Sequence, residues 1–320
     1  MHAVVLREFG PAENLRYEEV DDPAPAPGQV RIAVAACGVH LIDTTVRSGV
    51  SAGLFPLPEL PAIPGREVAG VVDAVGPGTD ETWLGRRVVA HLGPASRGYA
   101  ELAVREADAV HALPANVADD AAVAMIGTGR TTMAILEIAE LTAGDVVLIT
   151  AAAGGIGSLL VQAARAAGAT VVGAAGGAEK VERVRALGAD VAVDYTVAGW
   201  SEEVGDVTVA LDGVGGELGR QALETIAVGG RLVLFGYASG TVTRLSAGDL
   251  FSRGLTVSAA IGPRILQRPG GMRDLEEQAL AAAADGSLVP AVQHFRLAEA
   301  AAAHAALERR ATTGKVVLIP

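Results

Sequence analysis

The 320-residue chain is predicted to form two α/β domains: a β-rich domain, and a doubly wound parallel-sheet domain inserted into it. Half of the residues are hydrophobic, which is enough to fill two cores. Up to about residue 120, short runs of β-branched residues are separated by Gly and Pro, whereas strand-like and helix-like stretches alternate from there to residue 261. The expected boundaries are 1–120 and 262–320 for the β-rich domain and 121–261 for the inserted one.

Charge and composition exclude several classes of function. Twenty-five basic residues against thirty-seven acidic ones give a net charge of −12, which disfavours nucleic acid as a partner. The mean hydropathy of +0.37 comes from Ala and Gly, and polar residues or Gly interrupt the apolar stretches before the roughly 18 residues of a membrane helix. The first residues do not resemble a signal peptide. We expect a cytoplasmic protein with neither a nucleic-acid nor a membrane partner.

The apolar runs predict strands and helices along the whole chain. Expected strands of the β-rich domain are Val30–Ala36, Val68–Val75, Arg87–Leu92, Gly98–Val104 and Lys315–Ile319. Expected strands of the inserted domain are Asp145–Thr150, Thr170–Gly173, Val191–Asp194, Val207–Asp212, Arg231–Gly236 and Thr256–Ile261. Helices are expected at Ala121–Leu141, Ile156–Ala167, Ala178–Leu187, Glu217–Ala227, Met272–Ala284 and Leu297–Arg309.

The strongest local motif is a glycine-rich turn between the first strand and the next helix of the inserted domain. Compared with G-x-G-x-x-G, the sequence places Ala152, Gly154 and Gly157 at the three glycine positions. Gly154 would allow a pyrophosphate to approach the backbone, and Gly157 would allow close packing of helix on strand. A glycine-rich turn also occurs for packing reasons alone, but the repeated β–α units around this one favour a dinucleotide.

The choice between NAD and NADP depends on the end of the second strand of the inserted domain. A carboxylate there would bind both ribose hydroxyls, but the sequence after Val172 continues with Gly and Ala, and Glu179 falls in the following helix. Lys180 could instead meet a 2′-phosphate, or be a solvated helix residue. The sequence therefore favours NADPH.

Several segments together resemble the medium-chain dehydrogenase/reductase superfamily, and within it the zinc-independent quinone oxidoreductase (zeta-crystallin-like) family. The resemblance extends over essentially the whole chain. Its segments are Cys37–Gly49, Pro64–Val72, Ala152–Gly157, Phe235–Gly236 and Arg310–Lys315. It implies a GroES-like β-rich catalytic domain and a Rossmann domain, with the nicotinamide in the cleft between them. It also implies a homodimer joined through the Rossmann edge strand 256–261.

The resemblance also assigns residues to NADPH. Thr131 is expected near the nicotinamide, and Arg310 and Lys315 are expected to approach the cofactor. The residues expected at the pyrophosphate are Ala153, Gly154, Gly155, Ile156 and Gly157. Gly176, Lys180 and Tyr195 are expected around the adenosine phosphate, and Phe235, Gly236 and Tyr237 along the nicotinamide ribose. Tyr195 could alternatively be a rim residue without a ligand.

A metal site is not expected. Zinc-dependent relatives carry Cys at the position of His40 and His at the position of Arg66, and a guanidinium does not bind metal. With only Cys37 present, neither a thiolate-rich zinc lobe nor an intrachain disulfide can form. His40 with Glu67 or Asp43 would supply too few ligands, so no metal residue is assigned.

Without a metal, reduction of an already polarised acceptor is the easier chemistry. The expected reaction is hydride transfer to a quinone or to the β-carbon of an α,β-unsaturated carbonyl compound. Candidate catalytic residues are His40, Asp43 and Thr131, with His40 donating to the substrate oxygen. The alternatives are a packing role for His40 and a helix-capping role for Asp43.

Three positions depart from the family pattern, which has Asn at His40 and Tyr at Thr45 and Ser51. The missing aromatic rings cast doubt on simple benzoquinones, and an enone or a larger quinone becomes plausible. Two other functions remain open. One is a relative of zinc-type alcohol dehydrogenases with an altered metal site, and the other is a non-catalytic NADPH-binding structural or regulatory protein.

Overall fold

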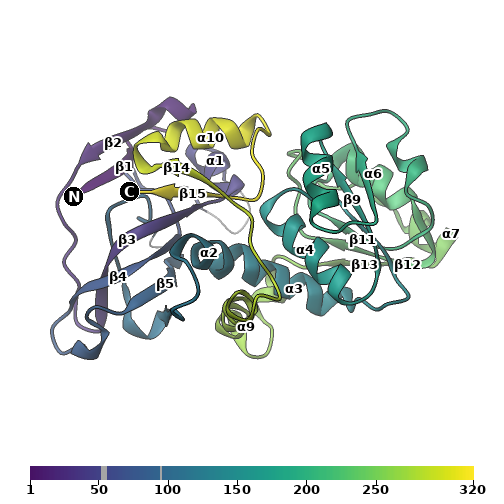
Figure 1. The fold of residues 1–320 in the computed structure, drawn as a ribbon. Helices are drawn as coiled ribbons and strands as arrows, with labels where there is room; N and C mark the ends of the chain where they lie inside the picture. The colour runs from purple at the N-terminus through teal and green to yellow at the C-terminus, as the bar shows by residue number, and fades with distance from the viewer. Residues whose placement is uncertain (52–55, 94–95) are drawn as a thin grey trace. The chain divides into compact units, whose positions relative to one another are not determined.

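The computed structural model describes residues 1–51, 56–93 and 96–320, which form two compact units (Figure 1). Unit 1 comprises Met1–Thr128 and Pro290–Pro320, and unit 2 comprises Gly129–Val289. Two domains are therefore present, one of them inserted between two parts of the other, as the sequence predicts.

The boundary near residue 262 differs from the expected one. Residues 262–289 form α8 (Pro263–Leu266) and α9 (Gly271–Asp285), and both belong to unit 2. Leu275 of α9 is fully buried and packs with Ala134 of α3 (Arg130–Ala139). The apolar face of α9 is therefore buried on the inserted domain, and the chain returns to unit 1 only at residue 290.

The core of unit 1 is a mostly antiparallel sheet with strand order β14-β15-β3-β4-β5-β7, and β6 also pairs with β3. Its strands are β3 (Gln29–Val39), β4 (Glu67–Val75), β5 (Arg87–His91), β6 (Leu102–Glu106), β7 (Val110–Ala112), β14 (Val292–Arg296) and β15 (Lys315–Ile319). β1 (His2–Leu6) and β2 (Leu15–Glu19) form a separate antiparallel pair. The last strand of the chain thus pairs with β3, near the start of the chain.

The register of this sheet brings distant polar residues to one end of it. Glu67 at the start of β4 is opposite Gly38 of β3 and His91 of β5. Val316 of β15 is opposite Val39, so Lys315 lies beside the end of β3 that leads to His40. Four strands therefore deliver these residues to the same place.

Among the described residues of unit 1, the α-helices are α1 (Leu41–Arg47), α2 (Asp119–Ala124) and α10 (Ala300–Glu308). α1 packs against α10, and α2 packs on β3 and β4 (Figure 1). The core below them includes the fully buried Ile32, Val68 and Tyr99.

Unit 2 contains a six-stranded sheet in which every pairing is parallel, with the order β10-β9-β8-β11-β12-β13. Its strands are β8 (Val146–Ile149), β9 (Thr170–Ala175), β10 (Val191–Asp194), β11 (Val207–Asp212), β12 (Ile226–Leu234) and β13 (Thr256–Ala259). Numbered along the chain, this is the 3-2-1-4-5-6 order of the Rossmann fold. The order reverses between β8 and β11, where such sheets bind their ligands.

Helices cover both faces of this sheet. On β8, Val147 and Ile149 point to the face packed by α3 and α4, whereas Leu148 points to the face packed by α6. The helices not yet given are α4 (Gly155–Ala166), α5 (Ala178–Ala186), α6 (Gly216–Glu224) and α7 (Ala247–Arg253). Because its strands are buried on both faces, this sheet reads in the sequence as continuous apolar runs.

The helix predicted from 121 to 141 is divided into α2, a π-helical turn at Met125–Gly129, and α3. Within the described ranges, this stretch, Asp119–Ala139, is the one helical segment with the length and composition to cross a membrane. Sixty-one per cent of its most apolar window is buried inside the protein, as in the core helices of soluble proteins.

The same Val→Ala substitution should destabilise the protein at a buried position of the parallel sheet and have little effect at an exposed one. Val209 on β11 has no exposed surface, whereas Val228 on β12 is 82% exposed. Val209→Ala should lower the free energy of unfolding by about 2 kcal/mol, because two buried methyl groups and their packing are lost. Val228→Ala should change it by less than about 0.5 kcal/mol. Urea denaturation of both variants checks this, and equal effects would contradict the assigned burial.

Candidate active site

The glycine-rich turn of unit 2 connects β8 to the N-terminus of α4. Ala151 adopts a left-handed backbone conformation with φ of 50°, and Gly154 is the N-cap of α4. A Cβ on Gly157 would overlap Ala151 and Ala152, so only glycine allows the first turn of α4 to pack this closely on the strand end. The first turn of a helix offers unpaired N–H groups and a partial positive charge, so this turn fits a pyrophosphate.

The neighbouring strand ends carry the residues expected around the adenosine phosphate. β9 ends at Ala175 and continues into Gly176, whose ideal Cβ position lies 3.1 Å from the Tyr195 ring. Asp194 at the end of β10 accepts hydrogen bonds from Gly177 N and from Thr196, and these bonds lower the pKa of its carboxyl. β9 itself ends at Ala175 before Gly176, and the carboxylate that lies beside this strand end is that of Asp194 from β10. Lys180 lies in the first turn of α5.

Asp212 at the end of β11 joins the loops around the point where the strand order reverses. Its carboxylate is fully buried and accepts hydrogen bonds from the hydroxyls of Thr150 (2.7 Å) and Thr243 (2.6 Å). It also accepts from the backbone N–H groups of Val214 (2.9 Å) and Gly215 (3.2 Å). A carboxylate with four donors fixes the turn after β8 and the loops after β11 and β12 relative to one another.

The loop after β12 contains the residues expected at the nicotinamide ribose. Phe235 is buried and donates its N–H to Asp212 O, and its ring occupies the space that a Cβ on Gly213 would need. Gly236 approaches the backbone of Gly213, whereas Tyr237 is 46% exposed. Thr131 lies near the start of α3 in the same unit.

In unit 1 the structure brings His40, Glu67 and Lys315 together. His40 Nε2 lies 2.7 Å from Glu67 Oε1 and 3.1 Å from Lys315 Nζ, and Lys315 Nζ lies 2.7 Å from Glu67 Oε2. The Glu67 side chain has no exposed surface and that of Lys315 has 4%, whereas that of His40 has 25%. The Glu67 oxygens make ion pairs at short distance but no well-aligned hydrogen bond. His40 is therefore the accessible member of a buried charge cluster.

The charge state of Glu67 follows from its surroundings. Burial alone would raise the pKa of its carboxyl, but the charges of His40 and Lys315 outweigh burial and hold that pKa well below its usual range. A Cβ on Gly38 or on Gly127 would overlap the carboxylate oxygens. Two glycines therefore make room for an ionised carboxylate inside the domain.

Asp43 sits in the first turn of α1, behind His40. Its Oδ2 accepts the backbone N–H of His40 (2.9 Å) and the hydroxyl of Tyr99 (3.0 Å), and its Oδ1 lies 3.7 Å from Arg66. The hydroxyl of Tyr99 also lies 3.1 Å from His304 Nε2. Asp43 thus caps α1 and positions the His40 backbone, the structural role that the sequence leaves open.

The protonation of the Tyr99 network follows from its donors. Burial and Asp43 raise the pKa of Tyr99 well above its ordinary value, so Tyr99 keeps its proton and donates it to Asp43. His304 Nε2 must then donate to the Tyr99 oxygen. Its Nδ1 is left without a hydrogen-bond partner among the described residues, which suits a neutral ring. Desolvation, helped by Arg47 and opposed by Asp43, lowers the pKa of His304 to about 4.

The predicted site residues fall in both units. His40, Asp43, Arg310 and Lys315 lie in unit 1, and the remaining predicted cofactor residues lie in unit 2. The ammonium of Lys315 contacts Glu67 and His40. Sequence reasoning did not identify Glu67 as an ion-pair partner, nor Asp212 and Tyr99, because their partners are distant in sequence.

Two further observations concern Cys37 and metal ligands. Burial raises the pKa of the Cys37 thiol to about 12, so it is a packing residue and not a nucleophile. Across residues 1–51, 56–93 and 96–320, no three His, Cys, Asp or Glu side chains form a group that could hold a metal ion.

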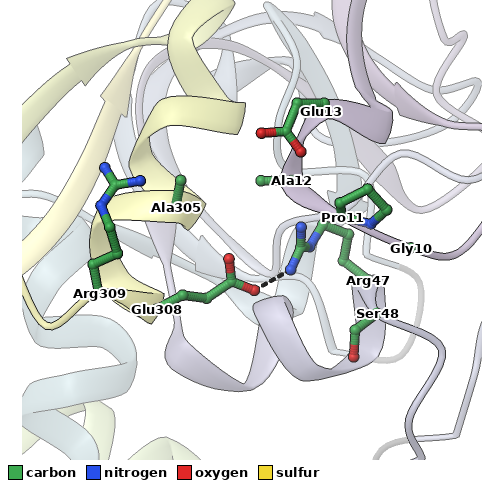
Figure 2. Close-up of a pocket in the computed structure, with 9 residues that line it drawn as sticks. All are labelled: Gly10, Pro11, Ala12, Glu13, Arg47, Ser48, Ala305, Glu308 and Arg309. Carbon is green, nitrogen blue, oxygen red and sulfur yellow. Dashed lines mark hydrogen bonds and ion pairs between the residues drawn. The ribbon is translucent and has the colours of Figure 1, made fainter.

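A separate cavity of about 430 Å³ lies in unit 1 between α1 and α10 (Figure 2). Figure 2 shows the ion pair between Arg47 and Glu308 inside it. Glu13 and Arg309 also line it, and no predicted site residue does. This cavity is therefore distinct from the residues that carry the proposed chemistry.

Comparison with known proteins agrees with this arrangement. Residues 26–129 match the alcohol dehydrogenase GroES-like domain, and residues 155–281 match the domain described as zinc-binding dehydrogenase. A quinone oxidoreductase of Pseudomonas aeruginosa is 34% identical, covering 98% of this chain and 97% of the relative. A 2-haloacrylate reductase of Burkholderia sp is 33% identical over 100% of this chain and 99% of the relative. The crystal structure of Escherichia coli quinone oxidoreductase complexed with NADPH superimposes with a TM-score of 0.87, at 30% identity and full coverage of both chains.

A GroES-like unit with an inserted Rossmann unit defines a medium-chain dehydrogenase/reductase, an oxidoreductase class. Within that superfamily, the chain belongs to the quinone oxidoreductase family.

The low pKa of His304 predicts acid sensitivity of the fold. The unfolded residue takes up a proton near pH 6.5, whereas the folded one does so only near pH 4. Stability should therefore fall as the pH drops between these values, by about 3 kcal/mol at about 1.4 kcal/mol per pKa unit. Urea denaturation from pH 7.5 to 4 measures the loss. His304→Gln should have a flatter profile over this range, and an unchanged slope would show that His304 is not the group responsible.

Proposed function

We propose that this protein is an NADPH-dependent reductase that transfers hydride to a quinone or to an α,β-unsaturated carbonyl compound. The observation that carries the proposal is the glycine-rich turn at the reversal point of a six-stranded Rossmann sheet. β9, which itself ends without a carboxylate and is followed by Lys180, favours a 2′-phosphate over a free ribose hydroxyl. NADPH supplies the hydride, and the chain binds both reactants and manages the proton.

The proposed cofactor contacts in unit 2 follow the strand ends. Ala153, Gly154, Gly155, Ile156 and Gly157 hold the pyrophosphate at the N-terminus of α4. Gly176, Lys180 and Tyr195 bind the adenosine phosphate, which is supported by the position of the Tyr195 ring, 3.1 Å from where a Cβ on Gly176 would lie. Phe235, Gly236 and Tyr237 line the nicotinamide ribose, and Thr131 lies near the nicotinamide.

In unit 1, His40 is the proposed catalytic residue. It donates a hydrogen bond to the acceptor oxygen, supported by its partial exposure and its fixed position in the charge cluster. Asp43 orients His40 through its backbone N–H. Arg310 remains a proposed cofactor contact, whereas Lys315 is proposed to act through His40 because its ammonium already contacts that ring.

The acceptor class follows from the chemistry of these residues. Arg66 stands where zinc-dependent relatives have a histidine ligand, which supports a zinc-independent reaction. The family favours a quinone, and similarity to a 2-haloacrylate reductase favours an activated alkene. Thr45 and Ser51 in place of aromatic residues favour acceptors other than simple benzoquinones.

We also propose that the protein is located in the cytoplasm and forms a homodimer. β13 is the edge strand of the unit 2 sheet and is only partly buried. An uncovered strand edge is a ready surface for pairing with a second copy of the chain.

The alternative function is that of an alcohol dehydrogenase with an altered metal site, which the match to the domain described as zinc-binding dehydrogenase favours. Metal analysis of the purified protein, with activity measured before and after chelation, separates the two. A chelator-sensitive alcohol oxidation would support the alternative.

The proposed function predicts a specific pattern of substrate use. Quinones, enals, enones and enoyl thioesters are mixed with the protein and either NADPH or NADH, and absorbance at the nicotinamide band is followed. At least one acceptor should be reduced, with a higher kcat/KM for NADPH than for NADH. Better use of NADH would overturn the cofactor assignment, and tight NADPH binding without turnover of any acceptor would point to a non-catalytic role.

Lys180 should account for part of the NADPH preference. Lys180→Ala should raise the KM for NADPH about tenfold to a hundredfold, because a charge-assisted bond to the 2′-phosphate is lost. The KM for NADH should change little. Arg183→Ala is the matched control, because it removes a cation of the same helix that pairs with Glu179. If both variants behave alike, Lys180 is a solvated helix residue.

A further inference from the structure

The loop after β12, residues 235–246, is bonded along its length to the loop after β11. The backbone N–H of Ala238 donates to Gly213 O at 3.0 Å. The backbone N–H of Ser239 donates to Val214 O at 2.8 Å. The residues proposed for the nicotinamide ribose therefore belong to a segment that the neighbouring loop holds in place.

Thr243 supplies the buried end of this attachment. Val242 beside it is 65% exposed, whereas Thr243 is 6% exposed, and its hydroxyl donates to Asp212 Oδ2 at 2.6 Å. The other oxygen of that carboxylate, Oδ1, accepts the hydroxyl of Thr150 at 2.7 Å, immediately before the glycine-rich turn. Hydrogen bonds to a charged acceptor are stronger than those between neutral groups. One carboxylate thus holds the loop after β12 with one oxygen and the glycine-rich turn with the other.

Gly219 of α6 makes room for the bond between Thr243 and Asp212. A Cβ on Gly219 would overlap both Thr243 Oγ1 and Asp212 Oδ2. Gly219 lies inside α6, where glycine stabilises a helix less than alanine does. The space above this glycine is filled by the two side chains that reach the loop after β12.

We propose that Asp212 and Thr243 are positioning residues that hold the loop after β12 in the conformation that receives the nicotinamide half of NADPH. This inference rests on the proposed function and deepens it, because it assigns the two halves of the cofactor to separately held parts of unit 2. The adenosine half is proposed to bind at the ends of β9 and β10, where Asp194 bonds Gly177 and Thr196. A loop that leaves its binding conformation for part of the time lowers the apparent affinity in proportion. Releasing Thr243 should therefore weaken binding of the nicotinamide half alone.

Two ligands test this separation without any turnover. Thr243→Val keeps the shape of the side chain and removes the hydroxyl, so the Kd for NADPH should rise about tenfold. Adenosine 2′,5′-bisphosphate has the adenosine phosphates but no nicotinamide ribose, and its Kd should stay at the wild-type value. Thr243→Ser retains the hydroxyl and should restore most of the affinity for NADPH. Isothermal titration calorimetry with each ligand measures both constants.

The opposite end of the same sheet supplies a matched control. The hydroxyl of Thr208 on β11 donates to Oδ1 of Asp145, a 7% exposed acid that precedes β8, at 2.8 Å. Thr208→Val therefore removes the same kind of bond at the strand starts, away from the strand ends that carry the proposed cofactor residues. It should destabilise the protein in urea at least as much as Thr243→Val, because Thr208 also accepts the N–H of Val146. The Kd of both ligands should be unchanged in it.

Two further variants act on the same bond in other ways. Gly219→Ala should displace the Thr243 hydroxyl and reproduce the loss of NADPH affinity. Asp212→Asn should weaken binding of both ligands, because the other oxygen of this carboxylate fixes the glycine-rich turn. Hydrogen exchange followed by mass spectrometry on the protein without ligand should show faster exchange of the Ala238 and Ser239 amides in Thr243→Val and Gly219→Ala than in the wild type. The control variant should exchange there at the wild-type rate.

The outcomes separate this inference from the proposed function. If the wild-type protein binds neither NADPH nor adenosine 2′,5′-bisphosphate, the proposed function fails and the inference fails with it. If the wild type binds both, the inference alone is overturned when Thr243→Val weakens both ligands equally or neither of them. It is likewise overturned when Thr208→Val weakens NADPH binding as much as Thr243→Val does. Gly219→Ala takes the place of Thr243→Val if the valine variant does not fold.

Discussion

An ionised carboxylate without solvent contact, that of Glu67, is the constraint on which unit 1 depends. Such a group is tolerated inside a protein only when opposite charges or hydrogen-bond donors lie beside it. The positive partner comes from the last strand of the chain, because β15 pairs with β3 and brings Lys315 to the carboxylate. The C-terminal segment is therefore an integral part of the β-rich unit, although a whole domain separates it from the rest in sequence.

The same principle operates in unit 2. Asp212 is fully buried at the point where the strand order reverses, and its four hydrogen-bond donors come from three different loops. These loops carry or adjoin the proposed cofactor residues. Each unit thus contains one buried acid that fixes proposed site residues: Asp212 fixes loops of the proposed cofactor site, and Glu67 contacts the proposed catalytic residue His40.

Much of the fold can be predicted from the sequence, because strands buried on both faces read as apolar runs. Val191–Asp194, Val207–Asp212 and Lys315–Ile319 have the bounds expected of them. β14 is not predicted, because Val292–Arg296 is polar and half-exposed at a sheet edge. The segment 262–289 reads as helical, but its sequence does not say which unit its apolar face will pack on.

The candidate site divides in the same way. Gly154 and Gly157 stand out because their spacing along the chain is itself the signal. The partnership of residues 40, 67 and 315 is created by strand register, so no local pattern indicates it. In the sequence, Glu67 suggests at most a metal ligand together with His40, whereas the structure pairs it with Lys315.

The most direct test of the whole account is reduction of an enone in D₂O with NADPH deuterated at nicotinamide C4, analysed by NMR of the product. The account predicts that nicotinamide deuterium appears at the β-carbon and solvent deuterium at the α-carbon. A product without nicotinamide deuterium at the β-carbon, for either C4 epimer, would contradict it.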